Sequence, residues 1–343
     1  MKKVFLAALL LAVAGVSLAV VVLRSWWHTP VAGVNVVLTV RAGSSIRSVA
    51  EDLSRQQLLR WPQLWLLLAR WQGQDEKIQR GEYDLQVSRS PQQLLDMLVQ
   101  GNVITYSLTL AEGLTFQEAF SLVQSQAKLS KRLNSSQDPA LLSLIAPREH
   151  LEGLFFPDTY VYRLGDSDLD ILSQAHRRMQ SVLEQAWTGR AVGLPYSDPY
   201  EALIMASIVE KETGLPTERE QIAGVFVRRL ENGMRLQTDP TVIYGLGEGF
   251  DGNLRRRHLN DLNNIYNTYR HSGLPPTPIA LPGRAALRAA LQPADGEALY
   301  FVARGDGSHQ FSATLADHEA AVRKYQLRRR ADYRSAPAQQ GEG

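Results

Sequence analysis

The sequence predicts an α+β protein with one N-terminal transmembrane helix, a small β-α-α-β module and a larger domain of mixed helices and strands. Three observations support this fold class. The chain opens with a long apolar run that no charge interrupts. A strand pattern, two helix patterns and a second strand pattern follow within about fifty residues. Helix and short-strand patterns then occupy the rest of the chain, and no internal repeat is evident.

The composition is that of a globular protein with an ample core. The chain has 343 residues, of which 44% are hydrophobic and 21% are charged, so it can hold two domains of ordinary size. The net charge of +2 is spread evenly, which does not favour nucleic acid as a partner. Cysteine is absent, and this excludes disulfides, thiolate metal sites and a cysteine nucleophile.

Several kinds of catalytic site lack their sequence signatures. The seven histidines show no spacing typical of zinc ligands, so we expect no metal. No P-loop or G-x-S-x-G motif is present, and the glycines at Gly245–Gly249 lack the strand-and-helix setting of a dinucleotide loop. We therefore expect no cofactor. Of the kinds of catalysis considered, acid–base chemistry by carboxyl groups is the one that the sequence leaves open.

Residues 4–25 are predicted to cross a membrane. The run from Val4 to Leu23 contains no charged residue and has about the length that a bilayer requires. Lys2 and Lys3 lie in the short segment before it, residues 1–3, and favour a cytoplasmic N-terminus.

We interpret this segment as an uncleaved signal anchor. The alternative is a signal peptide cleaved at Ala12-Val13-Ala14, but the apolar run continues well past that point. Trp26 and Trp27 are placed where membrane proteins carry interfacial aromatic residues. In either case the chain beyond His28 lies outside the cytoplasm. The prediction is a single-pass protein of the inner membrane whose main part is periplasmic.

Residues 35–101 are predicted to form the small module. Strands are expected at 35–41 and 81–87, on both sides of two helices that begin near Ile46 and Pro62. This order of elements resembles a LysM-type module, which binds glycans. A spacer domain without a ligand is the alternative.

The larger domain is predicted to span residues 102–332, followed by a mobile tail at 333–343. Its expected elements include a strand at 103–110, a long amphipathic helix at 167–187, a hairpin at 299–312 and a last helix at 315–330.

Two carboxyl groups stand at the end of a helix that is apolar on nearly every side. Asp198 can cap its first turn, and Gly214 ends it. Because apolar residues surround the axis, the helix should be largely buried. A buried carboxyl group has a raised pKa, as general acid catalysis requires. The alternative is that the run Glu210-Lys211-Glu212 is a solvated helix end.

Helical angles distinguish the two glutamates. Glu212 falls on the side of Glu201, which is expected to contact water. Glu210 falls above the small side chain of Ser207, where the pattern leaves room for a ligand, so it is the better candidate for chemistry. A second helix is expected after Thr217, which begins a capping-box pattern, and should pack antiparallel to the first.

Long polar loops follow these two helices. They lie at Leu236–Gly245, Asn267–Tyr269 and Gly273–Ile279, and prolines hold the last of them extended. Loops of this kind beside a buried acid would form the walls of a binding groove. A proline-rich connector without a ligand is an equal alternative.

Several segments resemble the endolytic murein transglycosylases, the YceG-like proteins. The segments are Ala206–Thr213, Arg235–Gly245, Asn267–Tyr269, Gly273–Pro276, Leu299–Val302 and Leu151–Tyr160. The resemblance covers nearly the whole chain, including the anchor and the LysM-like part. It implies an enzyme that cleaves the MurNAc-β-1,4-GlcNAc bond inside nascent peptidoglycan strands and leaves a 1,6-anhydroMurNAc end.

The resemblance also implies that the first glutamate of the E-K-E run, Glu210, is the catalytic residue. One carboxyl group is enough because the sugar's own 6-hydroxyl is the nucleophile, so the same group serves as general acid and then as base. The candidate substrate-binding residues are Gln237, Thr238, Asp239, Asn267, Tyr269 and Glu152, the last also as a fallback acid.

The implied partners are peptidoglycan glycan strands, the membrane through the N-terminal helix, and peptidoglycan synthases. Two other functions stay open. A non-enzymatic membrane-anchored protein would bind glycan or act as a scaffold for the synthesis machinery. A conventional hydrolase with two carboxyl groups would leave reducing ends instead of anhydro ends.

Overall fold

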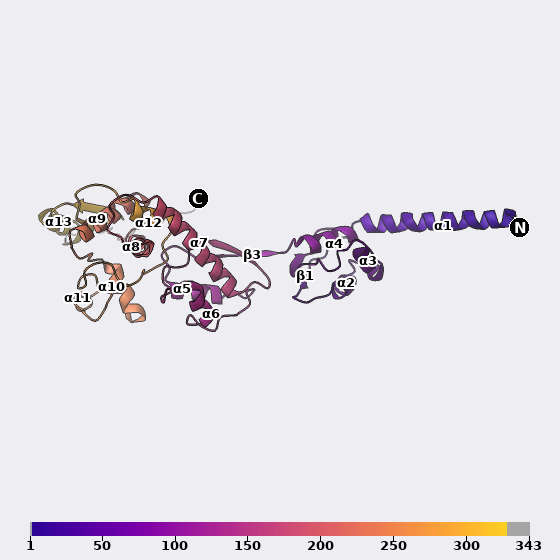
Figure 1. Ribbon diagram of the computed structural model, residues 1–343, viewed down its shortest axis with the longest axis horizontal. Coiled ribbons are helices and arrows are strands. Elements are labelled where there is room, and N and C mark those ends of the chain that lie inside the picture. Colours follow the sequence, from indigo (N-terminus) through magenta and orange to yellow (C-terminus); the bar gives the residue numbers. More distant parts are fainter. Residues whose placement is uncertain (1, 328–343) are drawn as a thin grey trace. The chain divides into compact units, whose positions relative to one another are not determined.

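The computed structural model describes residues 2–327, which form two compact units (Figure 1). The first unit contains the chain up to Ser107 together with residues 127–130 and 161–167, and the second contains residues 108–126, 131–160 and those from Asp168 onward. Helices dominate, and the strands of the described part occur only as three two-stranded sheets. This confirms the mixed α+β class.

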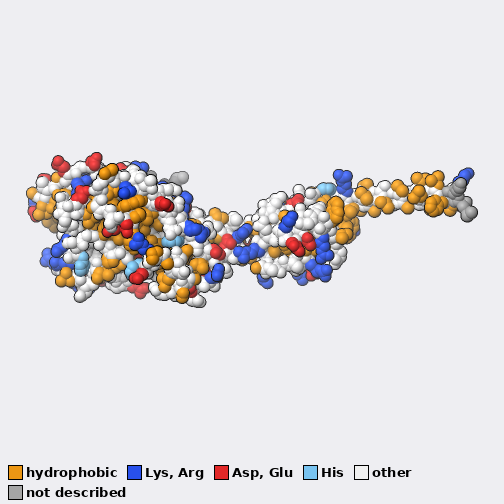
Figure 2. Space-filling model, in the orientation of Figure 1, with side chains coloured by type: hydrophobic (Ala, Val, Ile, Leu, Met, Phe, Trp, Pro, Cys, Tyr) orange, Lys and Arg blue, Asp and Glu red, His pale blue; other side chains and the backbone are white. Residues whose placement is uncertain are grey.

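The first unit begins with helix α1 (Lys2–His28), whose surface is almost entirely hydrophobic (Figure 2). Within the described residues it is the one helix long and apolar enough to cross a membrane, from Lys3 to His28. A membrane anchor and a signal sequence both fit this length and composition. The end of α1 is held by Trp27, which is buried in the core of the unit, and by Trp26, whose ring lies 5.2 Å from that of Trp61.

The β-α-α-β order predicted for the small module is confirmed. Strand β1 (Val37–Val40) is followed by α2 (Ile46–Arg55), α3 (Pro62–Trp71) and β2 (Gly81–Asp84), and then by α4 (Pro91–Gln100). The two strands pair antiparallel, with Leu38 opposite Tyr83. Trp65 is fully buried between the elements and donates its indole N–H to the carbonyl oxygen of Pro91 at 2.8 Å. LysM-like glycan binding by this module stays a prediction.

The chain continues through short elements into a long helix. These are β3 (Thr105–Thr109), α5 (Phe116–Gln124), α6 (Pro139–Ile145), β4 (Thr159–Arg163), which pairs with β3, and α7 (Asp168–Thr188). The first residue of α7, Asp168, is fully buried and accepts the backbone N–H groups of Arg132 and Leu133. A buried carboxylate with such partners orders the polar segment before α6.

Helix α8 (Pro199–Glu212) is surrounded by protein, as its apolar sequence predicts. It packs against α7, α9 (Arg219–Glu231) and α12 (Arg284–Leu291). The Asp198 carboxylate caps it by accepting the N–H groups of Tyr200 and Glu201. The capping box predicted at Thr217 is wrong. Residues 216–218 form the short 3-10 helix η1 (Pro216–Glu218), and α9 follows without a side-chain cap.

The remaining elements complete the second unit. They are α10 (Asp239–Leu246), η2 (Gly247–Gly249), α11 (Arg256–Leu259), the antiparallel hairpin of β5 (Tyr300–Ala303) and β6 (His309–Ser312), α13 (Leu315–Val322) and the π-helical turn η3 (Arg323–Leu327). The last predicted helix, 315–330, is therefore α13 up to Val322 and continues as η3. Its final residues and the predicted tail, 333–343, lie outside the described part of the chain.

Candidate active site

The two glutamates at the end of α8 leave the helix in different directions and contact different partners. Two residues along a helix correspond to a rotation of about 200°. Glu210 contacts the start of α9 and the segment before α12, whereas Glu212 contacts the loop before α10. The surroundings of each carboxyl group decide what it can do.

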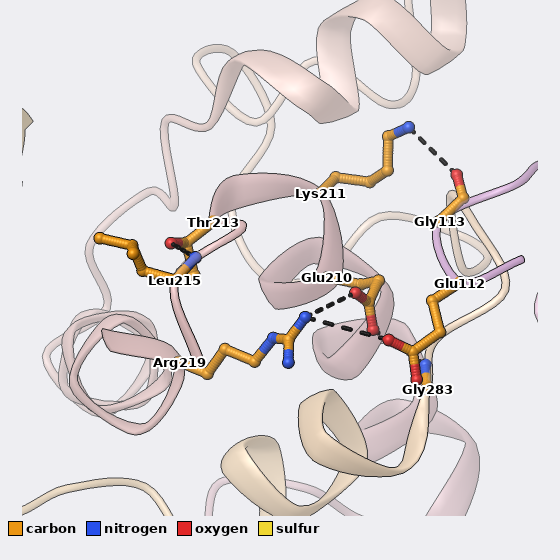
Figure 3. Close-up of polar contacts among 8 residues, drawn as sticks. All are labelled: Glu112, Gly113, Glu210, Lys211, Thr213, Leu215, Arg219 and Gly283. Atoms are coloured by element: carbon orange, nitrogen blue, oxygen red, sulfur yellow. Dashed lines mark hydrogen bonds and ion pairs between the residues drawn. The ribbon is translucent and has the colours of Figure 1, made fainter. Parts of the chain in front are cut away.

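Both oxygens of Glu210 are occupied by partners within the protein (Figure 3). The Gly283 N–H donates to Oε2 at 2.9 Å, and Nη2 of Arg219 lies 3.2 Å from Oε1. Arg219 also lies 4.0 Å from the Glu112 carboxylate, so it bridges two acids. The Glu210 side chain is 5% exposed, and this burial raises its pKa, against the opposing effects of the Gly283 N–H and the Arg219 charge.

The space expected above Ser207 is filled by protein. Ser207 is fully buried, and its hydroxyl oxygen accepts the backbone N–H of Ile279 at 2.9 Å. The segment before α12 therefore lies where the helical pattern left room for a ligand. A helical angle describes one helix and takes no account of a loop 72 residues further along the chain. A ligand site at Glu210 itself stays a prediction.

Glu212 is half-buried and lines a cavity, so its contact with water stays a prediction. The cavity has a volume of about 550 Å³. Burial raises the pKa of Glu212 to about 7; the Thr238 hydroxyl, which donates a hydrogen bond to Glu212, opposes this rise, and the negative charge of Asp239 adds to it. A carboxyl group of this kind is protonated in a large fraction of molecules at neutral pH.

We call this space the Glu212 cavity. Its walls come from the loop before α10, from β5 and β6, and from α13. The lining residues are Glu212, Arg229, Leu236, Gln237, Asp239, Tyr269, Tyr300, Phe301, Val302, Ala303, His309, Leu315, His318, Val322 and Gln326. Three of the predicted substrate-binding residues, Gln237, Asp239 and Tyr269, are therefore brought together with Glu212.

These three residues are held in defined positions on the wall. The Tyr269 hydroxyl donates to the Asp239 carboxylate at 2.7 Å. Gln237 has a φ of 53°, a left-handed conformation that is uncommon for a residue with a side chain. Such conformations cluster at functional sites, where the surrounding structure holds them in place.

Two of the other predicted residues, Asn267 and Glu152, lie elsewhere. Asn267 is fully buried, and its side-chain N–H groups donate to the carbonyl oxygens of His258, Leu259 and Asp261, so it orders its own loop. Glu152 lines a separate cavity of about 220 Å³.

Glu152 accepts the Phe116 N–H at 2.9 Å and the Tyr244 hydroxyl at 3.0 Å, and burial raises its pKa to about 7. It satisfies the first N–H group of α5. Neither Asn267 nor Glu152 contributes to the Glu212 cavity.

The comparison with known families gives a clear result. The model of the YceG-like family matches residues 38–324, which is most of the chain. This protein belongs to the YceG-like family.

Named relatives align with most of this YceG-like protein. The endolytic murein transglycosylase of Bacillus subtilis (strain 168) is 27% identical over 306 residues, 84% of each chain. The endolytic murein transglycosylase of Streptococcus pneumoniae (strain D39) is 26% identical over 324 residues, and the match covers 84% of this chain and 58% of the relative. A crystal structure described as a YceG-like protein from Listeria monocytogenes is 28% identical with a TM-score of 0.55, over 83% of this chain and 98% of that one.

A buried hydroxyl network supports Glu212 in this YceG-like chain. Thr238 is 2% exposed and donates its N–H to the Thr268 hydroxyl oxygen at 3.0 Å. The Thr241 hydroxyl lies 2.9 Å from that of Thr268 and donates to the Thr238 carbonyl oxygen at 2.8 Å. Sequence reasoning missed Thr268, although the Asn267–Tyr269 motif contains it.

Residues 2–327 of this YceG-like protein contain no group of three or more His, Asp or Glu side chains placed to hold a metal ion. The arrangement at the Glu212 cavity is suited to proton transfer and to the binding of a polar substrate.

Proposed function

We propose that this protein is an endolytic murein transglycosylase that cleaves the MurNAc-β-1,4-GlcNAc bond within nascent glycan strands and leaves a 1,6-anhydroMurNAc end. One observation carries the proposal. A carboxyl group with a pKa of about 7, that of Glu212, lines a cavity in a chain whose relatives are named endolytic murein transglycosylases. The volume of that cavity, about 550 Å³, is in the range of small-molecule and saccharide sites.

One carboxyl group can carry out both proton transfers. Protonated Glu212 donates its proton to the glycosidic oxygen as the bond from C1 of MurNAc to that oxygen breaks. The 6-hydroxyl of the same MurNAc then bonds to C1, and its proton passes to the Glu212 carboxylate. The acid is regenerated and no water is consumed. The attack is intramolecular, which favours it over hydrolysis in a site that holds the sugar in the right conformation.

The geometry favours Glu212 over Glu210 as this acid. Glu210 does not line the Glu212 cavity, and its oxygens are engaged by Arg219 and Gly283. Arg219 also opposes the rise that burial causes in the pKa of Glu210. Glu210 stays the prediction from the sequence, and substitution of each glutamate separates the two assignments.

Asp239 and Gln237 have supporting roles in the proposed reaction. The Asp239 carboxylate, oriented by the Tyr269 hydroxyl, stabilises the positive charge that develops at C1. Gln237 supplies an amide for sugar hydroxyl or acetamido groups. The shared cavity of Glu212 and Asp239 also favours a second candidate, a hydrolase in which Asp239 activates water.

Product analysis tests the proposal and separates the two candidates. Full-length protein in detergent is incubated with peptidoglycan, and the released glycans are analysed by mass spectrometry. Anhydro ends are lighter than reducing ends by one water. Internal cleavage with anhydro ends is the expected result. Reducing ends would establish the hydrolase, and uncleaved strands would favour a non-enzymatic glycan-binding or scaffolding protein.

The location of the reaction is part of the same proposal. Helix α1 anchors the protein in the inner membrane, and the catalytic domain, residues 102–332, acts on the periplasmic side. The module at 35–101 holds glycan strands as peptidoglycan synthases produce them. The apolar surface of α1 and the relatives' names support this placement.

The proposed acid predicts how activity depends on pH. Burial raises the pKa of Glu212 to about 7, and the reaction requires its protonated form. We expect kcat/KM to fall about tenfold per pH unit above that pKa and to level off below it. Initial rates between pH 5 and 9, with folding checked at each pH, measure this. A rate that rises steadily from pH 6 to 9 would contradict the assignment.

The hydrogen bonds of the buried threonines lead to a second prediction about the dependence of activity on pH. In Thr268→Val the Thr238 N–H loses its acceptor, so Thr238 holds Glu212 less firmly. We expect kcat to fall about tenfold. The fall in activity at high pH should also move to higher pH, because the Thr238 hydroxyl lowers the pKa of Glu212. Thr268→Ser keeps the hydroxyl group and should restore both kcat and the pH at which activity falls. A Ser variant as impaired as the Val variant would argue against a role for the Thr268 hydroxyl in holding Thr238.

A further inference from the structure

Glu218 and His309 form a second pair of titratable groups beside the Glu212 cavity. Glu218 lies in η1, and His309 is the first residue of β6. One Glu218 oxygen accepts the His309 backbone N–H at 2.9 Å, and the other lies 2.7 Å from Nδ1 of the imidazole ring. The two side chains are only 12% and 9% exposed, so this contact is largely shielded from water.

The contact with Glu218 determines which imidazole nitrogen carries the proton. A carboxylate can only accept a hydrogen bond, so Nδ1 is the protonated nitrogen of the neutral ring. In that tautomer Nε2 is a hydrogen-bond acceptor. No residue between 2 and 327 supplies a hydrogen bond to Nε2, and His309 lines the Glu212 cavity. A molecule bound in the Glu212 cavity therefore lies beside the His309 ring.

We propose that His309 is a saccharide-binding residue, whose Nε2 accepts a hydrogen bond from a hydroxyl or acetamido N–H group of the bound glycan. Glu218 acts as its positioning residue. This inference rests on the proposed function, because it assigns a glycan as the occupant of the cavity. It adds a contact from β6, where the sequence indicated only a β-hairpin.

The surrounding wall is suited to a sugar. The Phe301 ring meets the His309 ring edge-on at 5.4 Å, and the Tyr300 and His318 rings stack at 5.1 Å. Phe301, Tyr300 and His318 all line the same cavity. Saccharide sites combine apolar ring faces with a few well-oriented polar groups, and the fixed Nε2 provides such a group.

A binding experiment tests this contact without relying on turnover. The parent is full-length Glu212→Gln, and the probe is tetra-N-acetylchitotetraose, measured by calorimetry. His309→Asn is added to the parent because its amide N–H occupies about the position of Nδ1. The bond to Glu218 is thereby kept and only Nε2 is lost. His309→Gln places a polar atom near Nε2, and His271→Phe, outside the cavity, is the control.

We expect His309→Asn to weaken binding about tenfold, with an unchanged melting temperature. His309→Gln should recover part of the affinity, and His271→Phe should bind like the parent. The nitrogen-15 shift of Nε2 should change when the saccharide binds.

Equal affinity of the parent and His309→Asn would overturn the inference and leave the proposed function standing. Equal loss in the Asn and Gln variants together with a lower melting temperature would also overturn it, since this indicates a structural role. A parent that binds no saccharide at millimolar concentration would contradict both proposals.

Discussion

Glu212→Gln is expected to lower the rate of anhydro-end formation about 10³-fold, whereas Glu210→Gln lowers it less than about tenfold. Glutamine has nearly the shape of glutamate but cannot donate a proton to the leaving oxygen. Only Glu212 lines the cavity, and burial raises its pKa to about 7. Glu210 is held by Gly283 and Arg219, so its substitution changes local packing more than chemistry.

Single-turnover measurements on full-length protein, with products separated by mass, provide the comparison. Circular dichroism and melting temperatures of both variants show that each is folded. The opposite ranking, with Glu210→Gln inactive and Glu212→Gln active, would establish the assignment made from the sequence. It would also show that the Glu212 cavity is not where the glycan is cleaved.

The second large effect is expected from Arg229→Met, which should lower the free energy of unfolding by about 3 kcal/mol. Arg229 is 7% exposed and uses its guanidinium group to hold backbone. Its Nε donates to the Leu299 carbonyl oxygen at 2.7 Å, and Nη1 donates to that of Leu236 at 2.7 Å. Methionine fills much of the volume but leaves these buried carbonyl oxygens without donors.

Urea unfolding measures this loss, with Arg235→Met as a matched control because Arg235 is exposed and makes one bond to Tyr269. The control should unfold near the wild-type midpoint. Arg229→Lys should be intermediate, since an ammonium group cannot serve both carbonyl oxygens with the geometry of a guanidinium. If Arg229→Met unfolds like wild type, Arg229 does not join the loop at Leu236 to β5.

The local elements of this protein were largely readable from its sequence. The apolar residues all around α8 indicated a buried helix, and Asp198 before Pro199 indicated where it starts, because capping depends on neighbours in the chain. The β-α-α-β order of the module followed from periodicity in the same way. The motifs around residues 206–213 and 235–245 also carried the family resemblance, since family patterns are patterns in sequence.

Contacts between distant segments could not be read in this way. Whether Glu210 or Glu212 faces the cavity depends on the loop at Leu236–Asp239 and on the β5–β6 hairpin. Asn267 was predicted to bind a ligand, but its side-chain N–H groups donate to three backbone carbonyl oxygens nearby. A short polar motif does not reveal whether its hydrogen bonds are made to a ligand or to the protein.

The sequence by itself determined the apolar N-terminal helix, the order of the elements, the position of the E-K-E run at the end of a buried helix and the family. Only the tertiary structure decided which of the two glutamates lines the Glu212 cavity. Helical angles place the two side chains about 200° apart but do not show which segments each side contacts. Their difference arises because Arg219 and Gly283 contact Glu210, whereas Thr238 and the Glu212 cavity lie beside the other glutamate.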